Sequence, residues 1–182
     1  MMCGRFVVYS NSPFGLKYKI SYNISPSQLI PIKIKGGFKL LKWSYSPTWN
    51  KDMNLINCRF ETMNEKPSYK NAERCIIFHD GWYEWKKNNS EKIPYYHYSE
   101  SNYFAGLYND SGCLIVTRSA THNIKKIHHR QPVLLWPNEL LRYLDGENIF
   151  DSNANIKVNY HPVSNYVNNP LNNNSSLIEE VI

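Results

Sequence analysis

Cys3 is the residue most suited to covalent chemistry, because it lies at the start of the chain behind only two methionines. Once those methionines are removed, Cys3 carries a thiol and a free α-amine on adjacent carbons. Ordinary pKa values of about 8.5 for a thiol and about 7.7–8.0 for an α-amine leave part of each group reactive near neutral pH. An aldehyde condenses with the amine to an imine, and the thiolate then closes a five-membered thiazolidine ring. The sequence therefore predicts a nucleophile for aldehydes.

This reaction needs an acid that shuttles protons and a polar group that orients the intermediates. Glu84 lies between Tyr83 and Trp85, where partial burial would favour the protonated acid. His128 precedes an apolar run, and Asn57 with Arg59 belongs to a polar segment. Each also has an ordinary interpretation as a rim glutamate, a loop histidine or loop polar groups, and spacing alone does not separate the two.

The other cysteines, Cys58, Cys75 and Cys113, are widely spaced and form no Cys-x-x-Cys pair of the kind that structural zinc sites use. We expect them to be buried thiols, and we expect neither a metal nor a cofactor. The chain has no apolar run of membrane-spanning length and no hydrophobic leader. These features predict a cytoplasmic protein without membrane contact.

Positive charge is concentrated in the body of the chain. Residues 1–130 carry 19 Lys and Arg against 9 Asp and Glu, whereas residues 131–182 carry 2 against 6. A basic face interleaved with Trp43, Trp49, Trp82 and Tyr83 would suit a polyanion with exposed bases, because cations bind phosphates and flat rings stack on bases. On charge alone, a solvated lysine-rich surface is the favoured interpretation.

The elements that must position these residues are mostly strands. Short β-branched or aromatic runs predict strands at 5–9, 28–34, 38–43, 74–79, 82–86, 94–98, 103–108, 113–117 and 132–136. Helices are expected at 138–144 and, with weaker signals, at 65–73 and 121–127. The predicted fold is β-rich α+β, a barrel-like folded sheet with a few peripheral helices. A single domain over 1–165 would be followed by a loosely attached Asn-rich tail, 166–182.

Eight segments, in order along nearly the whole chain, carry a resemblance to a known family. They are Cys3-Gly4-Arg5-Phe6, Tyr22-Asn23-Ile24-Ser25-Pro26, Trp43-Ser44-Tyr45-Ser46-Pro47-Thr48-Trp49, Asn57-Cys58-Arg59-Phe60-Glu61-Thr62, Arg74-Cys75-Ile76 with Asp80-Gly81-Trp82-Tyr83-Glu84-Trp85, Tyr103-Phe104-Ala105-Gly106-Leu107-Tyr108, His128-His129-Arg130-Gln131-Pro132, and Pro162-Val163-Ser164 with Val167-Asn168-Asn169. Together they resemble the SRAP (SOS response-associated peptidase) family, whose members shield abasic sites in single-stranded DNA.

The resemblance implies roles for the candidate residues. Cys3 would crosslink to the aldehyde of the abasic site, Asn57 would hold the sugar, Glu84 would shuttle protons and His128 would be the second acid/base group. His129 is the alternative to His128, because the doubled histidine allows a shift of register. The DNA-binding residues would be Arg5, Arg59 and Arg130 on phosphates and Trp43 on unstacked bases. The family name also implies peptidase action, by which the chain would remove its own leading methionines.

Three positions depart from the family pattern. The chain begins Met1-Met2-Cys3 rather than Met-Cys, so the α-amine of Cys3 is in a peptide bond until both methionines are removed. Gln131 replaces a methionine and Ser44 a glycine.

Two further functions remain open from the sequence. An N-terminal-nucleophile hydrolase or glutamine amidotransferase also begins Met-Cys-Gly and uses the freed amine as a base, although the chain lacks an Asn-Gly-Asp segment. A non-catalytic single-strand binding module would bind DNA in a salt-sensitive way regardless of Cys3. We expect the protein to be a monomer.

Overall fold

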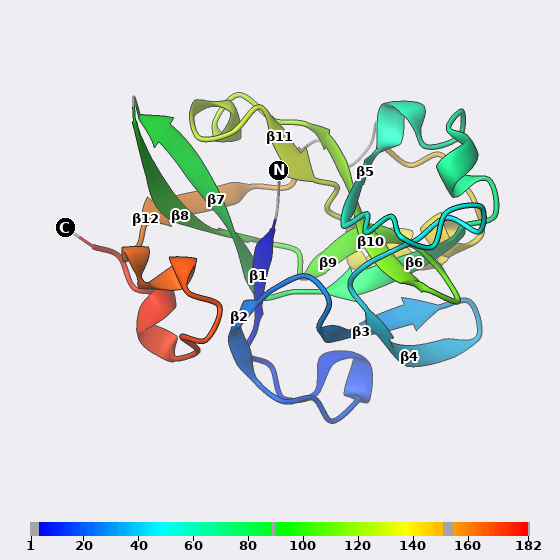
Figure 1. Cartoon of the computed structure of the whole chain (residues 1–182), viewed down its shortest axis with the longest axis horizontal. Coiled ribbons are helices and arrows are strands. Elements are labelled where there is room, and N and C mark those ends of the chain that lie inside the picture. Colours follow the sequence, from blue (N-terminus) through cyan, green and yellow to red (C-terminus); the bar gives the residue numbers. More distant parts are fainter. Residues whose placement is uncertain (1–3, 89, 151–154, 182) are drawn as a thin grey trace.

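The computed structural model describes residues 4–88, 90–150 and 155–181. These residues form two β-sheets with short helices around them (Figure 1). The first sheet has the strand order β12-β8-β7-β1-β2, where the strands are β1 (Arg5–Val8), β2 (Ser21–Ile24), β7 (Gly81–Asn88), β8 (Glu91–Ser99) and β12 (Val158–Pro162). The second sheet has the strand order β11-β10-β9-β6-β3-β4, with β5 beside β10. Its strands are β3 (Leu29–Ile34), β4 (Gly37–Lys42), β5 (Asn57–Arg59), β6 (Glu73–Phe78), β9 (Tyr103–Asn109), β10 (Gly112–Ser119) and β11 (Arg130–Pro132).

Helical structure is brief. The α-helix α1 (Leu140–Leu144) follows a 3₁₀ turn, η5 (Pro137–Glu139), so the helix predicted at 138–144 is confirmed with a tighter first turn. The helices predicted at 65–73 and 121–127 shrink to η3 (Pro67–Tyr69) and η4 (Ile124–Lys126). Pro67 keeps the preceding residue extended and so prevents an earlier helix start. Within the described ranges, none of the helices has the length and apolar character needed to cross a lipid bilayer.

The predicted β-rich α+β class is confirmed, but the word barrel-like is too strong. Both sheets stay open, because β12 and β2 are the edges of one and β11 and β4 are the edges of the other. Eight predicted strands are present within a few residues of their expected bounds. The ninth, 132–136, overlaps β11 only at Pro132. The rest is not a regular strand, although a bridge between Leu134 and Phe104 and further backbone hydrogen bonds join it to β9 and β10.

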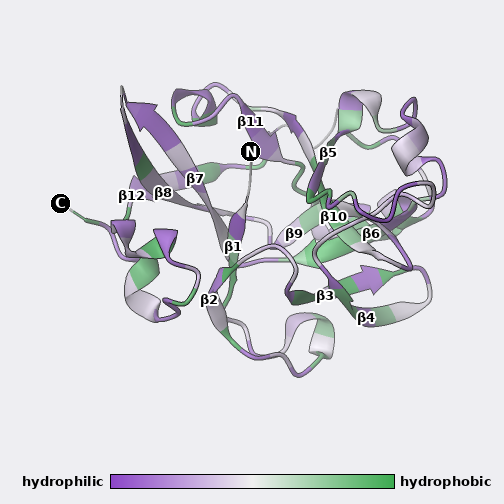
Figure 2. Ribbon diagram, in the orientation of Figure 1, coloured by the Kyte–Doolittle hydropathy of each residue, from purple (hydrophilic) through white to green (hydrophobic). Residues whose placement is uncertain are grey.

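Aromatic side chains from both sheets meet in the main core. Phe6 of β1 lies with its ring centre 5.0 Å from that of Trp43 and 6.2 Å from that of Phe104 on β9. Trp82 of β7 packs edge-on against Phe104 at 5.7 Å, and all four side chains are fully buried. Figure 2 shows hydrophobic residues along β6, β9 and β10 and hydrophilic residues at the end of β7 and around β11. The core therefore joins the strand that follows Cys3 to the centre of the second sheet.

The C-terminal segment is not a loose tail, and that prediction is wrong for residues 166–181. The segment contains two 3₁₀ turns, η7 (Asn165–Asn168) and η8 (Ser175–Ile178), and buries Val167 and Leu177. Its asparagines do not signal disorder here. The buried amide of Asn23 on β2 donates to the carbonyls of Val167, Asn169 and Asn172 at 2.9–3.2 Å. This part of the chain therefore belongs to the domain.

Candidate active site

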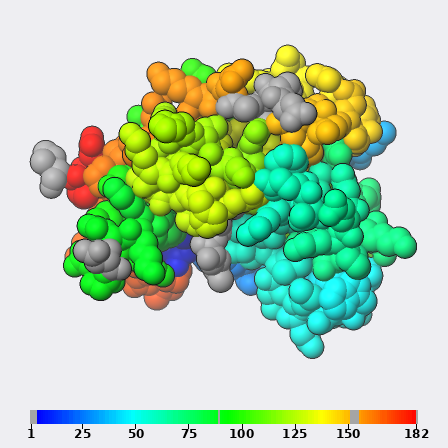
Figure 3. Space-filling view, turned by 90° about the horizontal axis from the view of Figure 1, so that it is seen from above, coloured from blue at the N-terminus to red at the C-terminus, as the bar shows by residue number. Residues whose placement is uncertain are grey.

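Two neighbouring pockets meet at His128. The larger, of 670 Å³, is called here the Glu84 pocket and is lined by Gly4, Arg5, Glu84, Trp85, Lys87, Lys92, His128 and Asn168. The smaller, of 420 Å³, is called the Asn57 pocket, and its wall includes Asn57, Arg59, Lys66, Tyr69, His128, His129 and Arg130. In Figure 3 the segment around residues 115–130 lies between those around 50–70 and 80–100, and blue N-terminal residues are visible deep between them. Residues far apart in the sequence thus form one concave site.

Cys3 lies outside the described residues, but the residue that follows it is part of the site. Gly4 lines the Glu84 pocket. Strand β1 runs antiparallel to β7, with Arg5 opposite Tyr83 and Phe6 opposite Trp82. One step further along this register, Gly4 comes opposite Glu84. The fold therefore directs the N-terminal end of β1 toward the carboxylate of Glu84.

Glu84 is a buried carboxylic acid in the wall of its pocket. Only 2% of its surface is exposed, and the neighbouring Tyr83 on the same strand is fully buried. The residue paired with Glu84 on the neighbouring strand β8 is Tyr95. A rim glutamate in water would be far more exposed, so the structure favours the functional interpretation of this position over the ordinary one.

Asn57 and Arg59 reach the second pocket from β5, a three-residue strand. It runs parallel to β10, with Asn57 opposite Ile115 and Arg59 opposite Thr117. Because side chains alternate along a strand, buried Cys58 points to the core while Asn57 and Arg59 point the other way. Arg59 is exposed, which leaves its guanidinium accessible from the pocket.

His128 is half-buried and lies in the walls of both pockets. Burial lowers its pKa below the ordinary value, which favours the neutral ring at neutral pH. The backbone N–H of Arg130 donates to Nδ1 of His128 at 3.1 Å. His129, whose ring centre lies 4.4 Å from that of His128, lines only the Asn57 pocket. Of the two histidines, His128 is thus the one that lines both pockets.

Arg5 and Arg130 are both held by protein groups. Arg5 donates to the side-chain oxygen of Asn23 at 2.8 Å and to the carbonyls of Val167 and Asn168 at 2.9 and 3.3 Å. Arg130 is 8% exposed and forms a two-pronged ion pair with Glu61 at 2.6 and 2.7 Å. Both line the pockets, but neither is the free surface cation that the predicted phosphate contact assumes.

Trp43 was predicted to stack on unpaired bases, and the structure contradicts this. The side chain is fully buried, and its indole N–H donates to the carbonyl of Ile56 at 3.0 Å. Trp82 and Tyr83 are also buried, whereas Trp49 is 60% exposed. Trp43, Trp82 and Tyr83 thus pack in the hydrophobic core and form no stacking surface.

The three described cysteines are confirmed as buried, free thiols. Burial raises the pKa of Cys58 to about 12 and raises those of Cys75 and Cys113 above the ordinary thiol value as well. A thiol with such a pKa is protonated at neutral pH and is a poor nucleophile. Among the four cysteines of the chain, Cys3 is therefore the candidate nucleophile.

Several residues that line the pockets were not predicted from the sequence. Trp85 donates from its indole N–H to the side-chain oxygen of Asn168 at 2.8 Å, and both line the Glu84 pocket with Lys87 and Lys92. Asn168 could have been found through its place in the Val167-Asn168-Asn169 motif. The two lysines lie near the tip of the β7–β8 hairpin, and only the fold brings them to the pocket.

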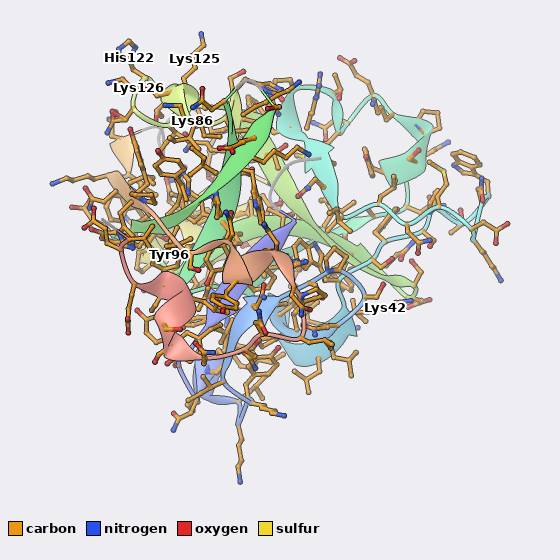
Figure 4. The ribbon with its side chains drawn as sticks, turned by 60° about the vertical axis from the view of Figure 1, so that its left-hand side comes forward. Lys42, Lys86, Tyr96, His122, Lys125 and Lys126 are labelled. Carbon is orange, nitrogen blue, oxygen red and sulfur yellow. The ribbon has the colours of Figure 1, made fainter. Side chains whose placement is uncertain are left out.

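Further positive charge lies beyond the pockets. Figure 4 shows Lys86 of β7 at the same end of the molecule as His122, Lys125 and Lys126 around η4, and far from Lys42. Lys86 adjoins Trp85 in the chain, and η4 ends two residues before His128. The positive residues at this end therefore border the site, as an interface for a polyanion requires.

Comparison with known proteins identifies the family of the chain. The sequence profile of the family described as SOS response associated peptidase (SRAP) matches residues 2–170. The abasic site processing protein YoaM of Bacillus subtilis is 33% identical, with 98% of each chain covered. The abasic site processing protein HMCES of Xenopus tropicalis is 28% identical over 91% of this chain and 68% of that protein. A solved structure from Bacteroides thetaiotaomicron shares the fold, with a TM-score of 0.81, 20% identity and coverage of 99% and 100%. The chain belongs to the SOS response associated peptidase (SRAP) family.

Proposed function

We propose that this protein acts on abasic sites in single-stranded DNA and bonds to them covalently through Cys3. One observation carries the proposal: Gly4, the residue after Cys3, lines a pocket together with buried Glu84 and half-buried His128. That pocket adjoins a second one with an amide, Asn57, and an exposed cation, Arg59. The names of the relatives YoaM and HMCES support the same substrate.

The reaction begins at the open-chain aldehyde of the abasic deoxyribose. The α-amine of Cys3 adds to the carbonyl carbon, and the resulting carbinolamine loses water to give an imine. The thiolate sulfur of Cys3 then adds to the imine carbon, the nitrogen takes a proton, and the thiazolidine ring is complete. One water is released and no redox partner is needed. Glu84, a buried carboxylic acid in the pocket wall, donates the proton to the departing hydroxyl.

His128 and Asn57 assist at the junction of the two pockets. Neutral His128 exchanges protons with the sugar during ring opening, and the Asn57 side chain holds the sugar hydroxyls. Arg59 binds a flanking phosphate from the Asn57 pocket, and Arg5 stabilises the nearby backbone charge while fixed by its carbonyl partners. Single-stranded DNA suits this concave site, because its abasic sugar can enter the pocket without the cost of disrupting a duplex.

Release of Met1 and Met2 precedes this reaction, and we assign it to the same site. The thiol of Cys3 attacks the carbonyl of Met2, the peptide nitrogen leaves as the free α-amine of Cys3, and water hydrolyses the thioester that joins Met2 to the sulfur. Glu84 or His128 supplies the proton to the leaving amine. The dipeptide departs, and both reactive groups of Cys3 become free.

The test uses protein whose N-terminus has been identified by mass spectrometry as Cys3. This protein is incubated with a single-stranded oligonucleotide that contains one abasic site, and the matched control carries an intact deoxyuridine. We expect an adduct that survives denaturing electrophoresis with the abasic oligonucleotide only, and none with Cys3→Ala. An undiminished adduct with Cys3→Ala, or an active protein that retains Met1, would contradict the proposal. Salt-sensitive binding that is equal for both oligonucleotides would instead identify a non-catalytic module.

A further inference from the structure

Glu61 makes the tightest ion pair of the site without lying in either pocket wall. It belongs to η2 (Phe60–Thr62), which follows β5 directly. Its two carboxylate oxygens accept from the two terminal nitrogens of Arg130 at 2.6 and 2.7 Å. This two-pronged geometry fixes the direction of the guanidinium as well as its distance. Residue 61 is therefore placed to control where Arg130 lies.

The ion pair connects three strands. Nη2 of Arg130 also donates to the backbone carbonyl of Thr117 on β10 at 2.7 Å. The hydroxyl of Thr117 donates in turn to the carbonyl of Cys58 on β5 at 2.7 Å, and the backbone N–H of Ser119 donates to Glu61 at 3.3 Å. Burial has the largest single effect and would raise the pKa of Glu61, but the hydrogen bonds and positive charge of Arg130 and the backbone hydrogen bonds, including that from Ser119, together lower the pKa. The carboxylate is thus charged at neutral pH and holds β5, β10 and β11 together.

Arg130 also controls the protonation of His128. Its backbone N–H lies 3.1 Å from the Nδ1 atom of His128, and this shorter contact favours Nδ1 as the acceptor. The carbonyl oxygen of the same residue lies slightly further from Nδ1, at 3.3 Å. The neutral ring consequently carries its proton on Nε2. The N–H holds this tautomer while the start of β11 stays in place, and both the pairing of Arg130 with Ser119 on β10 and the ion pair of its side chain keep it there.

We propose that Glu61 is a positioning residue for the reaction: by fixing Arg130, it sets the tautomer of His128 and keeps His128 in register with Asn57. Asn57 lies four residues before Glu61 on the adjoining strand, and His128 lies two residues before Arg130. The ion pair therefore spans the two segments that supply these side chains. The inference rests on the proposed function for its catalytic meaning, but the tautomer is a property of the free protein.

The first measurement needs no DNA. Nitrogen NMR of the His128 ring distinguishes the Nε2–H tautomer from the Nδ1–H tautomer in the whole protein. We expect the Nε2–H form in the native protein and a mixture of both forms in Glu61→Gln, which keeps the size of the side chain but loses one of the two acceptors. The matched control is Glu147→Gln, because Glu147 pairs with Arg142 at 2.7 Å on the exposed surface. Native protein with the Nδ1–H form, or a Glu61→Gln spectrum identical to the native one, would overturn the proposal.

The second measurement separates positioning from DNA binding. We expect Glu61→Gln to slow adduct formation at saturating abasic DNA about tenfold or more, as loss of an orienting partner does in other sites. Its affinity for undamaged single-stranded DNA should stay within about twofold, since a mispositioned His128 affects chemistry alone. Weaker DNA binding with an unchanged adduct rate would overturn the inference and make Arg130 a phosphate ligand that Glu61 merely holds.

Thermal melts of each variant are the control for loss of folding. Glu61→Asp retains the charge and should recover part of the adduct rate if the carboxylate positions Arg130. Absence of any adduct with native protein would refute the proposed function, whereas the tautomer measurement would still decide the inference about Glu61.

Discussion

The indole N–H of Trp85 donates to the side-chain oxygen of Asn168 at 2.8 Å, and this bond joins β7 to the C-terminal segment beside Glu84. Both residues line the Glu84 pocket, so the pocket wall depends on two parts of the chain that are 83 positions apart. Arg5 strengthens the same junction through its hydrogen bonds to the carbonyls of Val167 and Asn168. The pocket wall beside Glu84 is therefore held in part by residues near the end of the sequence.

Asn168→Ala should weaken this wall. Loss of one partly exposed hydrogen bond should lower the unfolding free energy by about 1 kcal/mol, measured by urea denaturation. The adduct rate should fall severalfold, because Trp85 is no longer held against the pocket. Asn165→Ala, an exposed change in the same 3₁₀ turn, is the control and should leave both quantities unchanged. An unchanged rate with Asn168→Ala would show that the wall does not shape the site.

Glu84→Gln should slow adduct formation by about a hundredfold or more, the usual contribution of a general acid. The amide preserves the size of the side chain but cannot donate a proton to the departing hydroxyl. The rate is measured in a single turnover with excess protein over abasic oligonucleotide. Glu91→Gln, on the exposed start of β8, should react at the native rate. A normal rate for Glu84→Gln would assign proton transfer to another group.

Stability should fall as the pH drops below about 6.5, because two histidines are buried in neutral form. Burial lowers the pKa of His97 to about 3 and that of His79 well below its ordinary value. The unfolded chain takes up these protons near pH 6.5 and the folded chain does not, so protons favour unfolding. Each histidine then lowers the free energy of unfolding by about 1.4 kcal/mol for each unit that the pH falls, until the pH reaches its pKa in the folded chain.

Urea unfolding at about pH 7, 5.5 and 4.5 measures this slope. His97→Phe keeps a ring against Trp82, on which His97 stacks at 5.3 Å, and should make the slope shallower. The exposed His122→Gln should retain the native slope. Equal slopes for native protein and His97→Phe would mean that His97 is protonated in the folded state.

Trp43→Ala should cost about 3–5 kcal/mol of unfolding free energy, because it empties a fully buried site. Trp49→Ala should change stability by no more than about 0.5 kcal/mol, since that side chain is 60% exposed. Trp43→Phe retains most of the core and should bind single-stranded DNA as the native protein does. Weaker DNA binding by Trp43→Phe at native stability would restore the stacking role that its burial contradicts.

The sequence predicted eight of the strands, because alternation of large side chains is a local signal. The predicted site residues Asn57, Glu84 and His128 line two adjoining pockets, and their chemical roles stay predictions. The sequence could not predict β5, whose three residues have no strand pattern of their own. That strand exists through parallel pairing to β10, more than 50 residues further along the chain. Since Asn57 and Arg59 lie on β5, their convergence with His128 depends on this distant pairing.

Burial was the other property that the sequence left undecided. Trp43 and Glu84 both lie among aromatic and polar neighbours, yet Trp43 packs in the core and Glu84 lines a pocket. The Asn-rich composition of residues 166–181 also predicted the wrong structure. These residues form 3₁₀ turns, and the side-chain amide of Asn23 donates hydrogen bonds to three of their backbone carbonyls. In each case the decisive partner lies far away in the sequence, so no local pattern could reveal it.

The attachment of the C-terminal segment to Arg5 and Asn23 has a consequence for biosynthesis. The ribosome releases the N-terminus first, but the carbonyls of residues 167–172 that these side chains bind are made almost last. A nascent chain therefore exposes Cys3 long before the wall beside Glu84 is complete. If the protein removes its leading methionines as we propose, that step would follow synthesis of residues 167–172, so a product truncated before them would keep its methionines and form no adduct.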